Sequence, residues 1–168
     1  MRVGITGHRG LPEEIALPVR EQLARHIDEY AVASHGDLVV VTCLADGPDT
    51  WCAYEALAHA GSIEAVIPAE DYRSVLPPRH HADFDHLLSH ASTVRRTGLA
   101  TSNGHAFMAA SELMLDSIEA LLAVWDGLPA HGYGGTADVV AEASKRGIPV
   151  NRVWPVGTVR PPNSAPVS

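Results

Sequence analysis

Short apolar runs alternate along the chain with longer segments in which apolar residues recur every three or four positions. The short runs are rich in β-branched residues and predict strands, whereas the longer segments predict amphipathic helices. The spacing of Ile15, Val19, Leu23 and Ile27 shows the helical period. Strands are predicted at 2–6, 38–42, 63–67, 92–95, 118–125 and 148–154, and helices at 11–33, 49–59, 104–117 and 136–145, with a polar, His-rich helix after Pro77-Pro78.

This alternation predicts an α/β fold, namely a single Rossmann-like, doubly wound sheet of about six mostly parallel strands with helices on both faces. Residues 38–42 (LVVVT) favour parallel pairing, because strands buried on both faces are continuous apolar runs. We expect one domain over residues 1–156 and a disordered, Pro- and Ser-rich tail over 157–168. In such folds ligands bind at the carboxyl ends of the strands.

Three glycine-containing turns each follow a predicted strand and lead into a predicted helix. They are Gly4–Gly10 (GITGHRG), Leu44–Asp49 (LADGPD) and Asp126–Thr136, which ends in GGT. Such turns place N–H groups at helix N-termini, where the helix dipole favours an anion. Together they predict one pocket for a phosphate-bearing ligand. The first turn lacks a GxGxxG motif and no acidic residue ends the second strand, which disfavours an ordinary dinucleotide dehydrogenase.

The order of these motifs resembles that of the SLOG superfamily. Residues 42–49 (TCLADGPD), followed by Ala56-Leu57 and Gly61, resemble a stretch of the DNA-processing protein DprA. The Gly134-Gly135-Thr136 turn resembles the loop of the LOG phosphoribohydrolases, which release a nucleobase from a nucleoside monophosphate. With the opening Gly4-x-x-Gly7-His-Arg, the resemblance covers most of residues 2–156. It implies a Rossmann-like sheet that binds nucleotides or nucleotide-derived ligands, often as a homodimer or a larger homo-oligomer.

The LOG catalytic pair has no counterpart in this chain. The position of the catalytic Glu, three residues after the loop Thr, is Val139, and the position of the catalytic Arg is Ala110. Residues 128–133 are also inserted before the glycine pair. The resemblance therefore implies a ligand that is held rather than cleaved by LOG chemistry.

We expect the phosphate on the turns at 7–10 and 134–136 and the base near Trp125. Arg9 could grip a phosphate bidentately or pair with a surface acid. Asp46 could accept a ribose hydroxyl, act as a base or be solvated, and Asp49 is expected to be a helix N-cap. Trp125 could stack on the base or fill the core. The expected ligand-binding residues are Gly7, His8, Arg9, Ala45, Asp46, Gly47, Trp125, Asp126, Gly134, Gly135 and Thr136, of which Thr136 would cap its helix and offer its hydroxyl to the phosphate.

Catalysis, if present, is expected at two acids. Asp126 follows the most apolar strand, where a partly dry crevice can raise the pKa of a carboxyl and let it act as an acid or base. Glu142 lies one helical turn beyond Val139, the LOG Glu position, and Asp138 is the direct neighbour of Val139. The first function hypothesis is a nucleotide sensor or carrier. The alternative is an N-glycosidase acting on nucleoside monophosphates, and a third hypothesis is a partner-binding module with a vestigial pocket.

Charge and composition narrow the partners. The net charge is −8, which disfavours a nucleic-acid partner because such affinity depends on Lys and Arg. No signal peptide or membrane span is apparent, and the two cysteines are too few for a disulfide framework, so a cytoplasmic protein is expected. The spacing within His80–His90 could hold zinc, but a solvated helix face is the preferred interpretation. We expect no metal and no firm cofactor beyond a nucleotide ligand.

Overall fold

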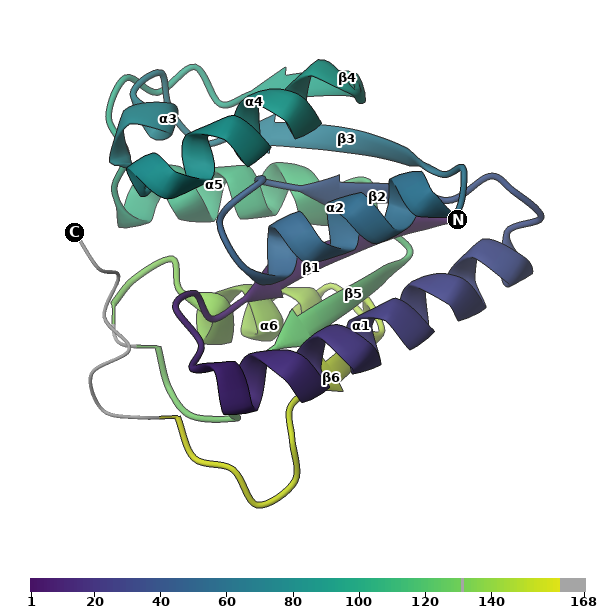
Figure 1. Cartoon of the computed structure of the whole chain (residues 1–168). Helices are drawn as coiled ribbons and strands as arrows, with labels where there is room; N and C mark the ends of the chain where they lie inside the picture. Colours follow the sequence, from purple (N-terminus) through teal and green to yellow (C-terminus); the bar gives the residue numbers. More distant parts are fainter. Residues whose placement is uncertain (131, 161–168) are drawn as a thin grey trace.

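A single parallel sheet organises the molecule (Figure 1). The computed structural model describes residues 1–130 and 132–160, and in these the strands lie in the order β4-β3-β2-β1-β5-β6. Every neighbouring pair is parallel, which confirms the doubly wound α/β fold. The strands are β1 (Arg2–Gly7), β2 (Val39–Thr42), β3 (Ser62–Ile67), β4 (Ala91–Arg96), β5 (Ala120–Val124) and β6 (Val150–Val153).

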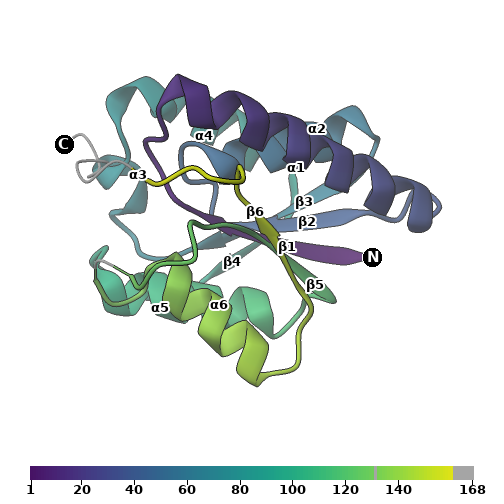
Figure 2. The ribbon, with the colours of Figure 1, turned by 90° about the horizontal axis from the view of Figure 1, so that it is seen from below.

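Helices cover both faces of this sheet (Figure 2). On one face α1 packs on α2 and α2 on α4, and on the other α5 packs on α6. Helix α1 buries the predicted apolar stripe and runs through Pro18 without a break. The helices are α1 (Glu13–Ala33), α2 (Pro48–Ala58), α3 (Tyr72–Val75), α4 (His81–Ser89), α5 (Gly104–Leu115) and α6 (Thr136–Lys145), with a short 3₁₀ helix, η1 (Pro78–His80), before α4.

The direction of winding reverses after β4, where the chain crosses back to place β5 on the other side of β1. From β1 the sheet continues through β2 to β4 on one side, and through β5 and β6 on the other. The strands adjacent to this switch point are apolar, and all five residues of β5 are buried. A doubly wound sheet leaves a crevice for ligands at such a point, outside the carboxyl ends of the strands.

Gly7 allows three elements to meet at this crevice. A Cβ atom at this position would lie 2.8 Å from Cβ of Val124 in β5 and 2.9 Å from Cγ of Pro48 in α2. Both distances are shorter than real Cβ contacts, so only glycine lets the end of β1 lie against the start of α2 and the end of β5.

Two sequence expectations concern the chain ends and membranes. Most of the expected disordered tail, residues 161–168, lies outside the described residues, as does His131. Residues 157–160 of that tail are described, and Arg160 lies against the crevice. Among the described helices, none is both long and apolar enough to cross a membrane.

Candidate functional site

A cavity of about 410 Å³ lies at the carboxyl ends of the central strands. All three glycine turns contribute to its wall, as the order of motifs predicts. The predicted residues that line it are Gly7, His8, Arg9, Ala45, Gly134, Gly135 and Thr136. Asp46 and Gly47 instead line a smaller neighbouring cavity of about 300 Å³. The described lining of the larger cavity does not include Trp125, Asp126 or Glu142.

The start of α6 forms one wall of the cavity. Gly134 has a φ of +83°, and a Cβ atom there would overlap the carbonyl oxygen of Gly104 at the start of α5. The N–H of Gly134 donates to Oδ2 of Asp138 at 2.9 Å, which closes the turn. The N-cap is Gly135, so the expectation that Thr136 caps the helix is wrong. Thr136 is the first helical residue, and its N–H has no acceptor within the described part of the chain.

The turn between β2 and α2 forms another part of the cavity wall and wraps around a carboxylate. The expected N-cap Asp49 is not the cap, because Gly47, with a φ of +93°, occupies that position. Asp49 lies in the first turn, 7% exposed, and its Oδ2 accepts from the hydroxyl of Thr42 (3.0 Å) and from the N–H groups of Cys43 (3.1 Å) and Ala45 (3.4 Å). The intervening Leu44 takes a left-handed φ of +58°, which bends the backbone around the carboxylate.

Burial shifts the pKa of Asp49 upward. Desolvation of the carboxyl raises its pKa to about 6 from the ordinary 3.8, although the donors named above and the charge of Arg9 act in the opposite direction. Burial likewise raises the pKa of the neighbouring Cys43 thiol far above its usual range, so this cysteine is a poor nucleophile at neutral pH.

Arg9 lies at the rim and is already paired. Its Nε donates to Oδ1 of Asp46 at 2.6 Å, so of the two alternatives for Arg9 the pair with an acid is the one that the structure contains. The other oxygen of Asp46 lies 3.9 Å from Nη2 of Arg79. Asp46 is therefore enclosed by two guanidinium groups, while Arg9 still contributes to the cavity wall.

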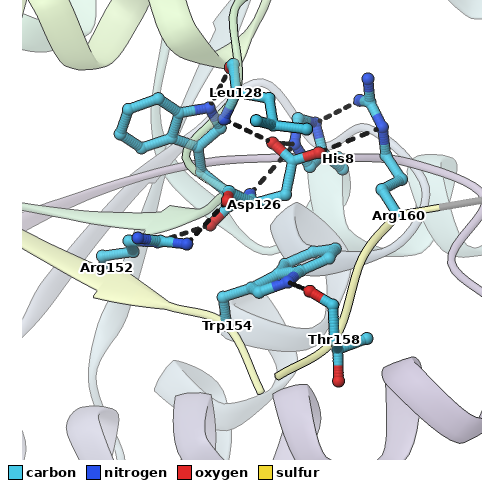
Figure 3. A network of polar contacts seen from close by, with 8 residues as sticks. His8, Asp126, Leu128, Arg152, Trp154, Thr158 and Arg160 are labelled. Carbon is cyan, nitrogen blue, oxygen red and sulfur yellow. Dashed lines mark hydrogen bonds and ion pairs between the residues drawn. The ribbon is translucent and has the colours of Figure 1, made fainter. Parts of the chain in front are cut away.

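His8, Asp126 and Arg160 form a polar cluster beside the cavity, with their side chains directed toward one another (Figure 3). Nη1 of Arg160 lies 3.0 Å from Nδ1 of His8, and Nε2 of His8 lies 3.1 Å from Oδ1 of Asp126. Because a guanidinium only donates, Nδ1 of His8 accepts, which assigns the ring proton to Nε2 and makes Asp126 its acceptor. The rings of Trp154 and His8 pack in a T-shaped arrangement, and the indole N–H of Trp154 donates to the carbonyl of Thr158.

Asp126 does not have the elevated pKa that its position suggested. Burial raises the pKa of its carboxyl, but the N–H of Leu128, the His8 ring and the charge of Arg160 together leave it below the ordinary value. The expectation of a raised pKa is therefore wrong. An ionised, paired carboxylate of this kind stabilises a fold and is a weak acid or base at neutral pH.

Trp125 and Glu142 point to other parts of the surface. The indole N–H of Trp125 donates to the carbonyl of Leu128 at 2.8 Å, and the guanidinium of Arg152 lies 5.7 Å from the ring centroid. Trp125 thus neither fills the core nor faces the cavity. Glu142 accepts from Nε of Arg146 at 2.8 Å, an ion pair that lowers the pKa of its carboxyl.

The two positions that the resemblance equates with the LOG catalytic residues lie in the apolar core. Val139 is 1% exposed and Ala110 is fully buried, in one cluster beneath the sheet. The structure therefore brings neither Asp126 nor Glu142 to the place of the lost Glu.

Sequence reasoning missed the apolar wall of the cavity. It consists of Ile5, Pro68, Tyr72, Phe107 and Met114, with Ser111 beside them. Tyr72 and Phe107 pack edge to face, with ring centroids 6.3 Å apart. Phe107 belongs to the apolar stripe of the helix predicted at 104–117, so its packing against the core could have been inferred from the sequence. Tyr72 lies in the least regular segment, where the pattern gave none.

The histidines of 80–90 mostly contact backbone carbonyls. Nε2 of His80 lies 2.9 Å from the carbonyl of Leu44, and Nε2 of His81 lies 3.0 Å from that of Leu76. The rings of His86 and His90 contact each other on the exposed side of α4, tilted by 42° with their centroids 4.4 Å apart. The surface-helix interpretation describes these last two, whereas buried His80 supports the turn that surrounds Asp49.

Comparison with known proteins identifies solved structures that share this architecture. No protein-family model matches the sequence, and no curated protein matches it significantly. Solved structures do match. DprA from Streptococcus pneumoniae superposes with a TM-score of 0.65 at 19% identity over 90% of this chain and 49% of that one. DprA from Helicobacter pylori gives 0.68 at 16% identity over 90% of this chain and 64% of the other, and TM1055, a structural-genomics target, gives 0.59 at 18% over 89% and 71%.

The chain shares the Rossmann-like fold of these solved structures. It spans about half the length of the pneumococcal DprA, and at these identities the likeness concerns the fold. One expectation is corrected by these neighbours. The net charge disfavoured a nucleic-acid partner, but the structure of the Helicobacter pylori protein is described for its single-stranded DNA binding mode. Net charge averages over a whole surface, whereas binding depends on the local distribution of charge.

Proposed function

We propose that this protein binds a nucleotide or a nucleotide-derived phosphate ligand in the cavity at the ends of β1, β2 and β5, as a sensor or carrier. The observation that carries the proposal is the start of α6, where Gly135 and Thr136 border the cavity. The N–H of Thr136 has no acceptor among the described residues, and the positive end of the helix dipole favours an anion there.

The remaining walls suit the rest of a nucleotide. Arg9 and Arg160, each paired with an acid, contribute guanidinium groups to the cavity wall, and Phe107 and Tyr72 provide apolar surface for a base. The base is therefore assigned to this wall rather than to Trp125. A volume of about 410 Å³ lies within the range of small-molecule sites, which runs from about 300 to 1,000 Å³.

The hydrolase alternative loses its support in the geometry. Its two acids, Asp126 and Glu142, are ionised partners of His8, Arg160 and Arg146, outside the described cavity lining. Binding without base release is the function that the site favours.

A ligand panel tests the proposal. It contains nucleoside mono- and diphosphates, dinucleotides, inorganic phosphate and a single-stranded oligodeoxynucleotide, the last because neighbours of this fold include DprA. At about a hundred times its Kd, a ligand adds about 2.7 kcal/mol to the free energy of unfolding, so the melting temperature should rise clearly. Stabilisation by no nucleotide of the panel would overturn the proposal. Stabilisation by the oligonucleotide alone would replace it with a DNA-binding function.

A pair of variants localises the phosphate. Thr136→Val removes a hydroxyl at the cavity without changing the volume of the side chain, and is expected to weaken nucleotide binding roughly ten- to hundredfold, the value of a hydrogen bond to a charged group. Ser144→Ala is the control, because that hydroxyl donates to Val140 further along the same helix. Isothermal titration measures both affinities, and chromatography of the incubated nucleotide checks that no base is released. Equal affinities for the two variants would contradict the assigned phosphate position.

A further inference from the structure

The two oxygens of the Asp49 carboxylate have different environments. Oδ2 accepts from Thr42, Cys43 and Ala45. Oδ1 has no donor within the described residues, although the side chain is more than nine-tenths buried and lines the cavity. The protein thus satisfies one side of this carboxylate itself and leaves the other side toward the ligand space.

A carboxylate oxygen that borders a cavity and accepts from no described residue offers a free acceptor, so a group that donates to it is favoured there. A phosphate does not fit this requirement, because it carries the same charge and lacks a donor when ionised. A neutral hydroxyl does. The cavity therefore has two chemically distinct ends, the start of α6 for an anion and Asp49 for a hydroxyl.

The sheet sets the separation of these ends. Asp49 lies in the first turn of α2, which follows β2, and Thr136 begins α6, which follows β5, with β1 between these two strands. Two strand spacings amount to about 9–10 Å, since neighbouring strands lie about 4.8 Å apart. A sugar phosphate held by its phosphate at one end and by a sugar hydroxyl at the other spans a distance of this order.

We infer that Oδ1 of Asp49 accepts a hydrogen bond from a ribose hydroxyl of the bound nucleotide and makes the site selective for ribonucleotides over their deoxy counterparts. The inference rests on the proposed function and names the class of ligand. It also transfers the role of ribose partner from Asp46 to Asp49. Asp46 was the expected ribose partner, but its oxygens face Arg9 and Arg79, whereas Asp49 has the available acceptor.

Asp49→Asn is a nearly isosteric test. The amide oxygen can still accept from Thr42, Cys43 and Ala45, while the amide NH₂ takes the place of Oδ1 and turns an acceptor into a donor. Asp85→Asn is the matched control, because Asp85 is exposed on α4 and pairs with Arg73. The probes are adenosine 5′-monophosphate and its 2′-deoxy and 3′-deoxy forms, titrated calorimetrically into each protein.

The wild type should bind adenosine monophosphate at least about tenfold more tightly than one of the deoxy forms, since a site built for a hydroxyl rejects an analogue lacking it. Asp49→Asn should lose that factor toward the ribonucleotide and lose nothing further toward the same deoxy form. The control should keep the wild-type ratio.

The failures are distinguishable. If no nucleotide of the panel binds, the proposed function and this inference both fail. Wild-type binding that is indifferent to both sugar hydroxyls overturns the inference alone. An Asp49→Asn variant that loses affinity equally for all three probes also overturns it, because a general structural effect would act in that way.

Discussion

Two buried carboxylates lie at opposite ends of the same sheet. Glu64, 5% exposed near the amino end, forms ion pairs through both oxygens, Oε2 with Arg2 and Oε1 with Arg95. Both arginines also donate to Ser117, Arg2 to its carbonyl and Arg95 to its hydroxyl. Asp49 at the carboxyl end has hydrogen-bond donors from the described residues on one oxygen only. A carboxylate matched on both sides joins elements together, whereas one that is matched on a single side and borders a cavity points to a ligand.

Asp126 lies between these two cases. It is near the cavity and, like Glu64, is surrounded by partners that favour its charge, namely His8 and Arg160. The pKa of Asp126 is lowered and that of Asp49 is raised, although both acids follow the ends of strands. Replacing each acid by its amide therefore tests the comparison, because the expected effects differ in sign.

The largest expected effect is at Asp49 and depends on pH. A folded-state pKa of about 6 against an ordinary 3.8 means that the folded state holds the proton more tightly, so the wild type loses stability as the pH rises from about 4 through 6. Asp49→Asn should therefore be more stable than the wild type by up to about 3 kcal/mol at about pH 7.5, with the difference vanishing near pH 4. Urea unfolding of both proteins across this range measures it. A difference independent of pH would show that the carboxyl is not titrating there.

Glu64→Gln is expected to lower the free energy of unfolding by about 2 kcal/mol. Removing one partner of a fully buried ion pair costs about 3–5 kcal/mol, and the cost is smaller here because Arg2 and Arg95 are partly exposed. Nucleotide affinity should not change, since this cluster lies at the other end of the sheet. Glu119→Gln, an exposed acid near the N-terminus, is the control. A loss of nucleotide affinity in Glu64→Gln would remove the distinction between the two ends.

The smallest effect is expected at Asp126. Asp126→Asn keeps an acceptor for the Leu128 N–H but removes the charge that faces His8 and Arg160, at a cost of about 1 kcal/mol at neutral pH. Because the folded-state pKa of this acid is lowered, its contribution is present above the ordinary value and is lost as the pH falls below it. Urea unfolding at neutral and acidic pH should show a deficit that disappears in acid. A stabilised Asp126→Asn variant would show that the folded state disfavours the charge of Asp126, as it does that of Asp49.

The fold could be predicted because its signals are local. The apolar run before Thr42 and the stripe of α1 each need only a few neighbouring residues, and α6 has the predicted bounds, Thr136–Lys145. The glycine turns could also be predicted, because glycine marks places that other residues cannot occupy. At Gly134 the structure shows such a place, with a positive φ and a close backbone approach. The convergence of the turns on one cavity follows from the parallel order of the strands.

The side-chain assignments failed where direction mattered. Asp49 follows Gly47 and reads as an N-cap, but the left-handed Leu44 brings the chain of the turn around it. Nothing in the sequence indicates that Trp125 turns toward Leu128, or that Glu142 faces Arg146 rather than the cavity. Arg160 was missed because a Pro-rich composition says nothing of a single ion pair with Asp126. These features depend on contacts between segments far apart in the sequence.

The central place of β1 also has a consequence for synthesis of the chain. β1 is made first and can pair with β2 soon afterwards, but its other edge pairs only with β5, at Ala120–Val124. Until that segment emerges from the ribosome, one of the two central strands of the finished sheet has an open edge, and open edges recruit other chains. Fragments that end between residues 97 and 119 would display this edge permanently. They are the forms of this protein from which aggregation is expected to start.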